Sequence, residues 1–324
     1  MILNVAYSSD NNYAPYLGIS MLSMLENNSD DFESIHIFII DNGISSDNMK
    51  KLKSIAKDYG ATISFVKLDE LCVGLKTDGS FSKSSFGRIF LSRLPKIEKI
   101  IYLDSDSIVL GSFKELCQSD MTDCYVAGVQ DNVYPFFKEM IDIPKKTRYI
   151  NAGFLLVNLT LWRKDHLEEK CIATINRFHG SVPHHDQGVI NHVCAGRIKI
   201  LHPKYNVQPP MFYLTSRQIK TISNEGHYYS DTEIKDACKK PIFVHFTTDV
   251  YNRPWFSPCS HPLADCYYDY MIKSPWGNIV TKKKLPFKTR VTKLISRVPL
   301  VYTRVYVPIV RFEKRIRIKR RLKH

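Results

Sequence analysis

The sequence of 324 residues predicts an α/β fold, in which a parallel sheet is flanked by helices, followed by a basic C-terminal tail. Three observations support this prediction. Strand and helix patterns alternate over about the first 110 residues, which is typical of a sheet covered by helices. Acidic residues directly follow several of the predicted strands. The charge is uneven, since a nearly neutral body precedes a strongly basic end.

The first elements alternate regularly. Strands are predicted at residues 2–8, 35–41, 61–68 and 99–104, and helices at 15–27, 45–60 and 85–94. The helix at 15–27 places Leu17, Met21 and Leu25 on one face. The helix at 45–60 begins with cap residues and ends at Gly60, so both of its ends are marked.

The later elements are spaced less regularly. Strands are predicted at 124–131, 151–159 and 239–247, the last of them buried, and a helix is predicted at 166–180. In the basic tail, Pro286, Pro299 and Pro308 are expected to break any long helix.

The composition indicates a globular protein of the cytoplasm. No apolar run reaches the roughly 18 residues that span a bilayer. The N-terminus lacks a basic region and is interpreted as a strand instead of a signal peptide. The eight cysteines form no CxxC pair, so reduced thiols are expected. A zinc site from Cys259, His261 and Cys266 is an alternative use of two of them.

Two aspartates interrupt the apolar stretch "EKIIYLDSDSIVLGS" at residues 98–112. In an extended chain, Asp104 and Asp106 point to the same face, about 6.5–7 Å apart. A divalent cation would remove the repulsion between them, and oxygen ligands favour Mg²⁺ or Mn²⁺. The alternative is a solvated strand end that carries two turn-forming aspartates.

Five ordered blocks resemble glycosyltransferase family 8, the retaining nucleotide-sugar transferases. They are "AYSSDNNYAPYLGISMLS", "FGRIFLSRLPKIEKIIYLDSDSIV", "YINAGFLLVNLTLWR", "HDQGVIN" and "VHFTTDVYNRPW", which together cover roughly residues 2–255. Within the family, the sequence is most similar to bacterial lipopolysaccharide and lipooligosaccharide glucosyl- and galactosyltransferases. The resemblance implies the GT-A fold, a Rossmann-like mixed sheet flanked by helices.

The resemblance also implies roles for individual residues. Asp104, Asp106 and His245 would hold Mn²⁺, with Mg²⁺ as a possible substitute, and the ion would bridge the phosphates of a UDP-sugar. Further residues match the donor site: Asp10, Asn12 and Tyr13 for uridine, Arg88 and Arg253 for phosphates or sugar, and Asp131, Asn151, Asp186 and Gln187 around the hexose. Gly188, Thr248 and Asn11 depart from the family pattern.

The function implied is that of a retaining hexosyltransferase, which moves glucose or galactose from a UDP-sugar to a saccharide or lipid-linked acceptor in surface-glycan synthesis. Gln187 is the candidate catalytic group, as a weak nucleophile or an electrostatic stabiliser, and front-face attack is the alternative to a covalent intermediate. Two other classes remain open: a phosphatase of the haloacid dehalogenase class, and a non-catalytic or hydrolytic nucleotide-sugar-binding protein.

Residues 1–278 are predicted to form the transferase domain and residues 279–324, hereafter the tail, a membrane-associating segment. The tail holds 16 of the 46 Lys and Arg residues but one acidic residue, Glu313. Residues 287–298 have the pattern of an interfacial amphipathic helix. Peripheral attachment to the anionic cytoplasmic leaflet is therefore expected. Nucleic-acid binding and a solvated, unstructured tail are the rival interpretations, and no nucleic-acid partner is expected.

Overall fold

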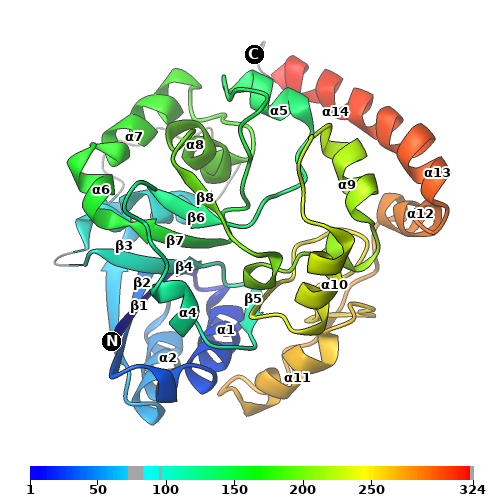
Figure 1. Ribbon diagram of the computed structural model, residues 1–324. Helices are drawn as coiled ribbons and strands as arrows, with labels where there is room; N and C mark the ends of the chain where they lie inside the picture. Colours follow the sequence, from blue (N-terminus) through cyan, green and yellow to red (C-terminus); the bar gives the residue numbers. More distant parts are fainter. Residues whose placement is uncertain (72–82, 95–96, 322–324) are drawn as a thin grey trace.

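The computed structural model describes residues 1–71, 83–94 and 97–321. Within them, seven strands form a central sheet in the order β3-β2-β1-β4-β7-β6-β8 (Figure 1). These strands are β1 (Ile2–Asp10), β2 (Ser34–Asn42), β3 (Thr62–Lys67), β4 (Lys99–Leu103), β6 (Val126–Gly128), β7 (Phe154–Asn158) and β8 (Ile198–Ile200). Strands β1 to β4 are parallel, whereas β7 is antiparallel to β4 and β6. The sheet is therefore mixed, and the predicted α/β class is confirmed.

The sheet separates two hydrophobic cores, because successive side chains of a strand point to opposite faces. In β4, Ile101 and Leu103 enter one core, and Ile100 and Tyr102 enter the other. The first core is covered by α1 (Ala14–Glu26), α2 (Ser46–Asp58), α10 (Asp231–Lys239) and α11 (Ala264–Lys273). The second is covered by η2 (Lys83–Arg93), α6 (Leu159–Lys164), α7 (Leu167–Arg177) and α8 (His185–Val193).

Short elements complete the body of the molecule. The helical ones are η1 (Ser29–Asp31), α3 (Leu68–Leu71), α4 (Lys114–Cys117), α5 (Pro135–Met140), η3 (Pro203–Tyr205), η4 (Pro209–Phe212) and α9 (Ser216–Ser223). Two pairs of short strands lie outside the central sheet: β5 (Ser107–Val109) with β9 (Phe243–His245), and β10 (Phe256–Ser257) with β11 (Thr281–Lys282).

For residues 1–278, the predicted strands and helices differ from the structure in three places. The helical stretch at 85–94 is a 3₁₀ helix. The strand predicted at 124–131 is shorter in the structure, where it is β6 (Val126–Gly128). Gln130, beyond the end of β6, forms only an isolated bridge with Ile150. The buried strand expected at 239–247 is β9, which pairs with β5 and not with the central sheet.

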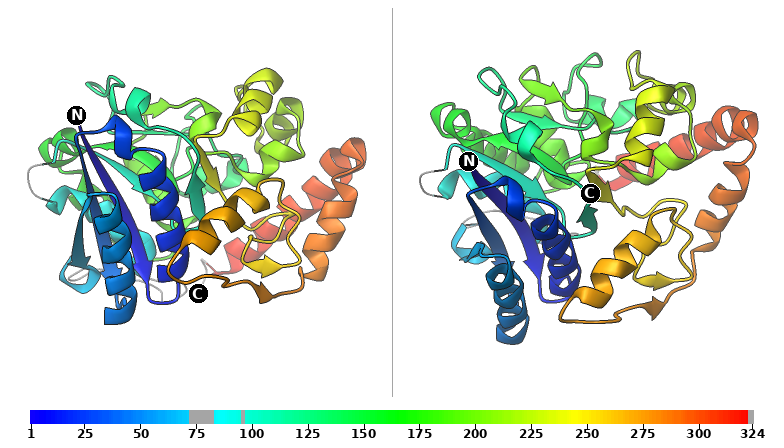
Figure 2. Two further views of the ribbon diagram at one scale, coloured as in Figure 1. Left: turned by 90° about the horizontal axis from the view of Figure 1, so that it is seen from below. Right: turned by 60° about the horizontal axis from the view of Figure 1, so that its bottom comes forward.

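After the short strand β11, the tail is mainly helical from Phe287 to Arg321, the last residue that the structure describes. It forms α12 (Phe287–Ile295), α13 (Pro299–Val301), the π-helical turn η5 (Tyr302–Tyr306) and α14 (Val307–Arg321), which run along one edge of the molecule (Figure 2). The prediction that Pro308 breaks the helix is wrong. Pro308 is the second residue of α14, where its missing N–H is tolerated after the wider π turn. No helix among the described residues is both long and apolar enough to cross a bilayer.

A buried ion pair fixes α5 to the segment that follows α9. The Lys138 side chain is 2% exposed. Its Nζ donates to the carbonyl oxygens of Lys145 and Thr147, each at 2.7 Å, and pairs with Glu225 Oε1 at 2.5 Å. The ammonium group is thus fully partnered.

We expect Glu225→Ala to lower the free energy of unfolding by about 3 kcal/mol, because Lys138 would stay buried without its counter-charge. Urea denaturation measures this loss. The control is Glu26→Ala, which breaks the exposed pair with Lys273 and should cost less than about 1 kcal/mol. Equal losses for the two variants would contradict the prediction.

Candidate functional site

The site lies where β4 ends. Asp104 directly follows this strand, and its N–H donates to the Gly153 carbonyl at 2.8 Å, at the start of the antiparallel β7. The segment Asn151–Gly153 is therefore brought to the same edge of the sheet as Asp104. Ligands of open α/β sheets bind outside this carboxyl edge.

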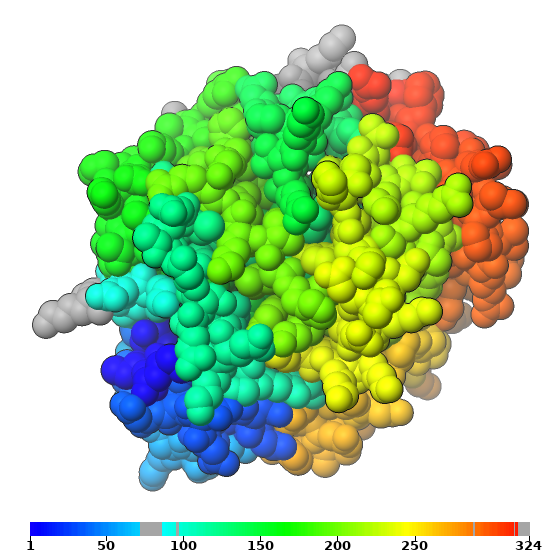
Figure 3. Space-filling view, in the orientation of Figure 1, coloured from blue at the N-terminus to red at the C-terminus, as the bar shows by residue number. Residues whose placement is uncertain are grey.

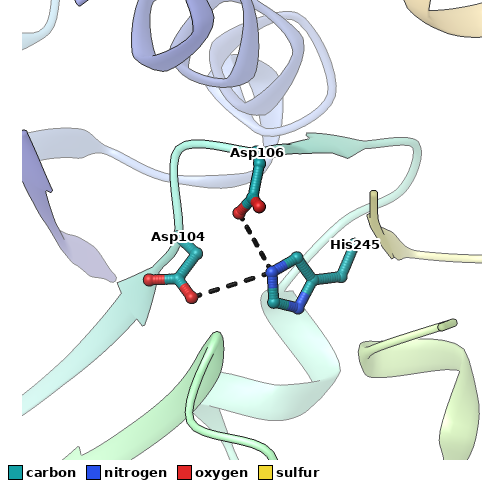
Figure 4. A group of neighbouring side chains, drawn as sticks. All are labelled: Asp104, Asp106 and His245. Carbon is teal, nitrogen blue, oxygen red and sulfur yellow. Dashed lines mark hydrogen bonds and ion pairs between the residues drawn. The ribbon is translucent and has the colours of Figure 1, made fainter. Parts of the chain in front are cut away.

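The pairing of β5 with β9 brings His245 to the two aspartates. Ser107 pairs with His245, and Asp106 immediately precedes Ser107. His245 Nε2 lies 3.0 Å from Asp106 Oδ1 and 3.7 Å from Asp104 Oδ2 (Figure 4). These three ligand atoms lie within 4.8 Å of one another. Two carboxylate oxygens and one imidazole nitrogen suit Mn²⁺ or Mg²⁺, so the three residues form a candidate metal site.

The alternative zinc group is not seen. Among the described residues, one group of three potential ligands lies close enough together to share a metal ion, and it is Asp104, Asp106 and His245. Cys259, His261 and Cys266 do not form such a group. The Cys259 sulfur instead donates to the Asn252 carbonyl and accepts from the His261 N–H. The seven described cysteines are free thiols.

Gly153 creates the space that the histidine occupies. A Cβ at this position would lie 2.2 Å from His245 Cε1 and 2.9 Å from Asp104 Oδ2. Real Cβ atoms do not approach other atoms so closely, so any side chain at 153 would displace the imidazole. The sequence reasoning did not assign this role, because it treated Asn151-Ala152-Gly153 only as a turn or as part of the hexose site.

Two arginines balance the two aspartates. Arg88 is 7% exposed, and its Nη2 lies 2.7 Å from Asp104 Oδ1. Its Nε forms an ion pair with Asp186 Oδ2 at 2.8 Å, although the geometry is not that of a hydrogen bond. Arg253 Nη2 lies 2.7 Å from Asp106 Oδ2, and Nη1 donates to the Tyr13 hydroxyl at 2.6 Å. Arg88 and Arg253 thus orient the candidate metal ligands.

Burial and the neighbouring charges shift the pKa values of two acidic groups in the site in opposite directions. Burial alone would raise the pKa of Asp106, but His245 and Arg253 outweigh burial and hold this pKa well below its usual range. For Asp186, burial dominates and raises the pKa to about 6, although Arg88 acts to lower it. Asp106 is therefore ionised at neutral pH, as a metal ligand must be.

Asp131, Asn151 and Gln187 form a closed network of hydrogen bonds. Asn151 Nδ2 and Gln187 Nε2 both donate to Asp131 Oδ2, at 3.1 and 3.0 Å. Gln187 Oε1 accepts from Asn151 Nδ2 at 3.2 Å and from the Ala152 N–H at 3.0 Å. The orientation of the Gln187 amide is fixed, because a backbone N–H can only donate and a carboxylate can only accept.

A cavity of about 740 Å³ joins these groups. Ten of the twelve residues expected from the sequence line it: Tyr13, Arg88, Asp104, Asp106, Asp131, Asn151, Asp186, Gln187, His245 and Arg253. Asp10 and Asn12 lie outside its lining. Asp10 Oδ1 accepts from the Tyr13 N–H at 2.9 Å and so shapes the turn before α1.

The departures from the family pattern have local explanations. A Cβ at Gly188 would lie 2.0 Å from the Pro183 carbonyl oxygen, so the segment before α8 leaves no room for an aspartate there. Asn11 Oδ1 accepts from the Ser45 N–H and from Asn48 Nδ2, each at 2.9 Å, and so holds the start of α2. Thr248 lines the cavity.

Sequence reasoning missed several cavity residues. Gln208 is 5% exposed and lines the cavity, and its Nε2 has no hydrogen-bond partner. Asn206 donates to Asn151 Oδ1 at 2.9 Å and so supports the amide network. The available signal for these residues was the pair of amides, Asn206 and Gln208, in "YNVQPP". This segment follows no predicted strand, so the pair was not assigned to the site.

Comparisons with known proteins agree with this architecture. The model of glycosyl transferase family 8 matches residues 4–259. General stress protein A of Bacillus subtilis is 30% identical over 285 residues, which cover 86% of this chain and 96% of that protein. Lipopolysaccharide 1,3-galactosyltransferase of Salmonella typhimurium is 23% identical over 302 residues, which cover 89% of this chain and 84% of the other.

Solved structures share the fold. The crystal structure of the galactosyltransferase LgtC in complex with donor and acceptor sugar analogs superimposes with a TM-score of 0.69 at 21% identity, and the match covers 89% of this chain and 99% of that one. A hydrolytic or non-catalytic binding protein is not favoured by these matches. The family match and the shared GT-A fold lead to one conclusion: the chain belongs to glycosyltransferase family 8 and is a glycosyltransferase.

Proposed function

We propose that the protein is a metal-dependent, retaining hexosyltransferase that moves glucose or galactose from a UDP-sugar to a saccharide or lipid-linked acceptor of a surface glycan. The observation that carries this proposal is the convergence of Asp104, Asp106 and His245 in a cavity that also contains Asp131 and Gln187. Relatives named as lipopolysaccharide galactosyl- and glucosyltransferases support the donor and acceptor classes.

The donor diphosphate would be held on the side of the cavity that carries Asp104, Asp106 and His245. These residues would bind Mn²⁺ or Mg²⁺, which when bound stabilises the charge of the diphosphate leaving group as a Lewis acid. Arg253 pairs with Asp106 and lines the same cavity, so its guanidinium would bind phosphate oxygens of the donor. The Tyr13 ring, whose hydroxyl bonds Arg253, would stack on the uracil, with Asp10 and Asn12 at the outer end.

The network of Asp131, Asn151 and Gln187 would hold the hexose. Gln187 Oε1 already accepts two hydrogen bonds, so its lone pairs are engaged and it is a poor nucleophile in this arrangement. This supports front-face attack. In that step the C1–oxygen bond to the diphosphate breaks, the acceptor oxygen bonds C1 on the same face, and the acceptor proton passes to the departing phosphate oxygen. The ionised Asp186 would orient hexose hydroxyls and hold Arg88.

The tail is proposed to bind the anionic inner leaflet of the cell membrane, while residues 1–278 carry the transferase. Apolar side chains stand exposed along it, with Phe287 at 78%, Leu294 at 65% and Phe312 at 68% exposure. They are interspersed with 16 Lys and Arg residues, of which Lys323 lies outside the described residues. Apolar burial and attraction to anionic lipid, about 1 kcal/mol per basic group near the surface, would act together.

Asp106→Ala is expected to reduce metal-dependent UDP release by at least about 100-fold, because it removes one of three ligands and the partner of Arg253. The protein is incubated with UDP-glucose or UDP-galactose, with and without Mn²⁺, and free UDP is measured. The exposed Asp120→Ala serves as the control and should match the wild type. Full activity of Asp106→Ala would refute the metal assignment.

Gly153→Ala is expected to weaken Mn²⁺ binding by about 10-fold or more, since the added methyl group displaces the His245 imidazole. Titration calorimetry with MnCl₂ measures the affinity without any turnover. Gly226→Ala is the matched control, because a Cβ at this position meets no atom within 4 Å. Unchanged affinity in Gly153→Ala would show that His245 is not a ligand.

The combined substitution Phe287→Ser, Leu294→Ser and Phe312→Ser is expected to abolish flotation of the full-length protein with phosphatidylglycerol-containing liposomes. All three side chains are exposed, so the fold should persist. Ile272→Ser is the control, because Ile272 on α11 is 70% exposed but lies outside the tail. If the triple variant floats like the wild type, membrane binding through the tail is excluded.

A further inference from the structure

The tail reaches the cavity of the candidate active site. Tyr302, in the π-helical turn η5, is 7% exposed and lines the same cavity as His245 and the two aspartates. Its ring packs edge to face against Tyr213 at 6.5 Å and stacks on Tyr306 at 5.8 Å. One wall of the cavity thus includes a residue nearly 60 positions beyond His245.

A second tail residue holds that wall in place. Arg311 Nη2 donates to the Ile222 carbonyl oxygen in α9 at 2.6 Å, and its guanidinium lies 5.5 Å from the centre of the Tyr134 ring. Both Ile222 and Tyr134 line the cavity. Figure 3 shows the tail against the edge formed by the segments of α9 and α5. The tail therefore braces three separate pieces of the wall, at Tyr134, Tyr213 and Ile222.

This part of the cavity has the chemistry of a saccharide site. It presents the rings of Tyr134, Phe137, Tyr213 and Tyr302, together with the carboxylate of Asp249, which accepts from the Tyr213 hydroxyl at 2.6 Å. Aromatic rings stack on the apolar C–H faces of sugars, and a few polar groups fix the orientation of a ligand. The charged groups Asp104, Asp106, Arg88 and Arg253 also line the cavity, where they form ion pairs with one another.

We infer that Tyr302 is part of the acceptor-saccharide subsite, so that the tail completes the active site in addition to any contact with lipid. This inference rests on the proposed transferase function. Tyr302 and Val310 face the body, whereas Leu300, Val305 and Ile309 of the same segment are 53–65% exposed. A lipid-linked acceptor would then present its sugar to the subsite beside the helix whose outer face contacts the bilayer.

Saccharide binding by full-length protein in solution, without lipid, tests the inference. The probes are methyl β-glucoside, methyl β-galactoside and lactose, with UDP and Mn²⁺ present, and binding is followed by saturation-transfer NMR. Tyr302→Ala and Tyr302→Leu are both expected to weaken binding of whichever probe binds the wild type about 10-fold, because both remove the aromatic ring. The leucine restores side-chain volume, so a loss in Tyr302→Leu reports the missing ring. Tyr302→Phe should retain binding, and the exposed Val305→Ala is the control.

The affinity for UDP separates a local effect from unfolding. We expect UDP affinity within about twofold of the wild type in all four variants. Three results would each overturn the inference. They are a wild-type saccharide affinity in Tyr302→Leu, a loss of saccharide affinity in Val305→Ala equal to that in the Tyr302 variants, and no binding of any probe to the wild type. Failure of the proposed function has a different signature, which is the absence of UDP release from UDP-sugars by a wild-type protein that still binds the probe.

Discussion

The pairing of β5 with β9 is the constraint on which the site depends. It joins residues 107–109 to residues 243–245 and places an imidazole between two carboxylates that lie 139 and 141 positions earlier in the chain. Asp106 and His245 are buried and Asp104 is partly buried, so an unbalanced charge there would be costly. Arg88 and Arg253 supply the balance, one for each aspartate. The ligand geometry is therefore held by ion pairs as well as by the strand ladder, which favours a preorganised site.

Local patterns were sufficient to predict the first half of the fold. Alternating apolar residues and helix caps located β1, α1, β2, α2 and β3 to within a few residues, because each of these elements is determined by its own side chains. The rule that ligands gather at the carboxyl ends of strands also identified Asp104 and Asp106. His245 required the family resemblance, since nothing in "PIFVHFT" alone distinguishes a ligand from a core histidine.

The remaining features depend on contacts between distant segments. β9 has the sequence of a central strand but pairs outside the main sheet. The importance of Gly153 emerges only when His245 is placed against it, and the tail position of Tyr302 gives no hint that it lines the cavity. Pro308 misled the prediction because a π-helical turn precedes it, and that turn depends on packing as well as on local sequence.

The close approach of Gly188 to the Pro183 carbonyl has a consequence for redesign. An attempt to restore the acidic residue of the family pattern at position 188 would meet backbone, which cannot rotate aside as a side chain can. To make room for that residue, the loop from Val182 to His185 and the first turn of α8 would have to be replaced together. The residue type at position 188 is thus limited by a block of backbone conformation, with two consecutive left-handed histidines, His184 and His185, at its centre.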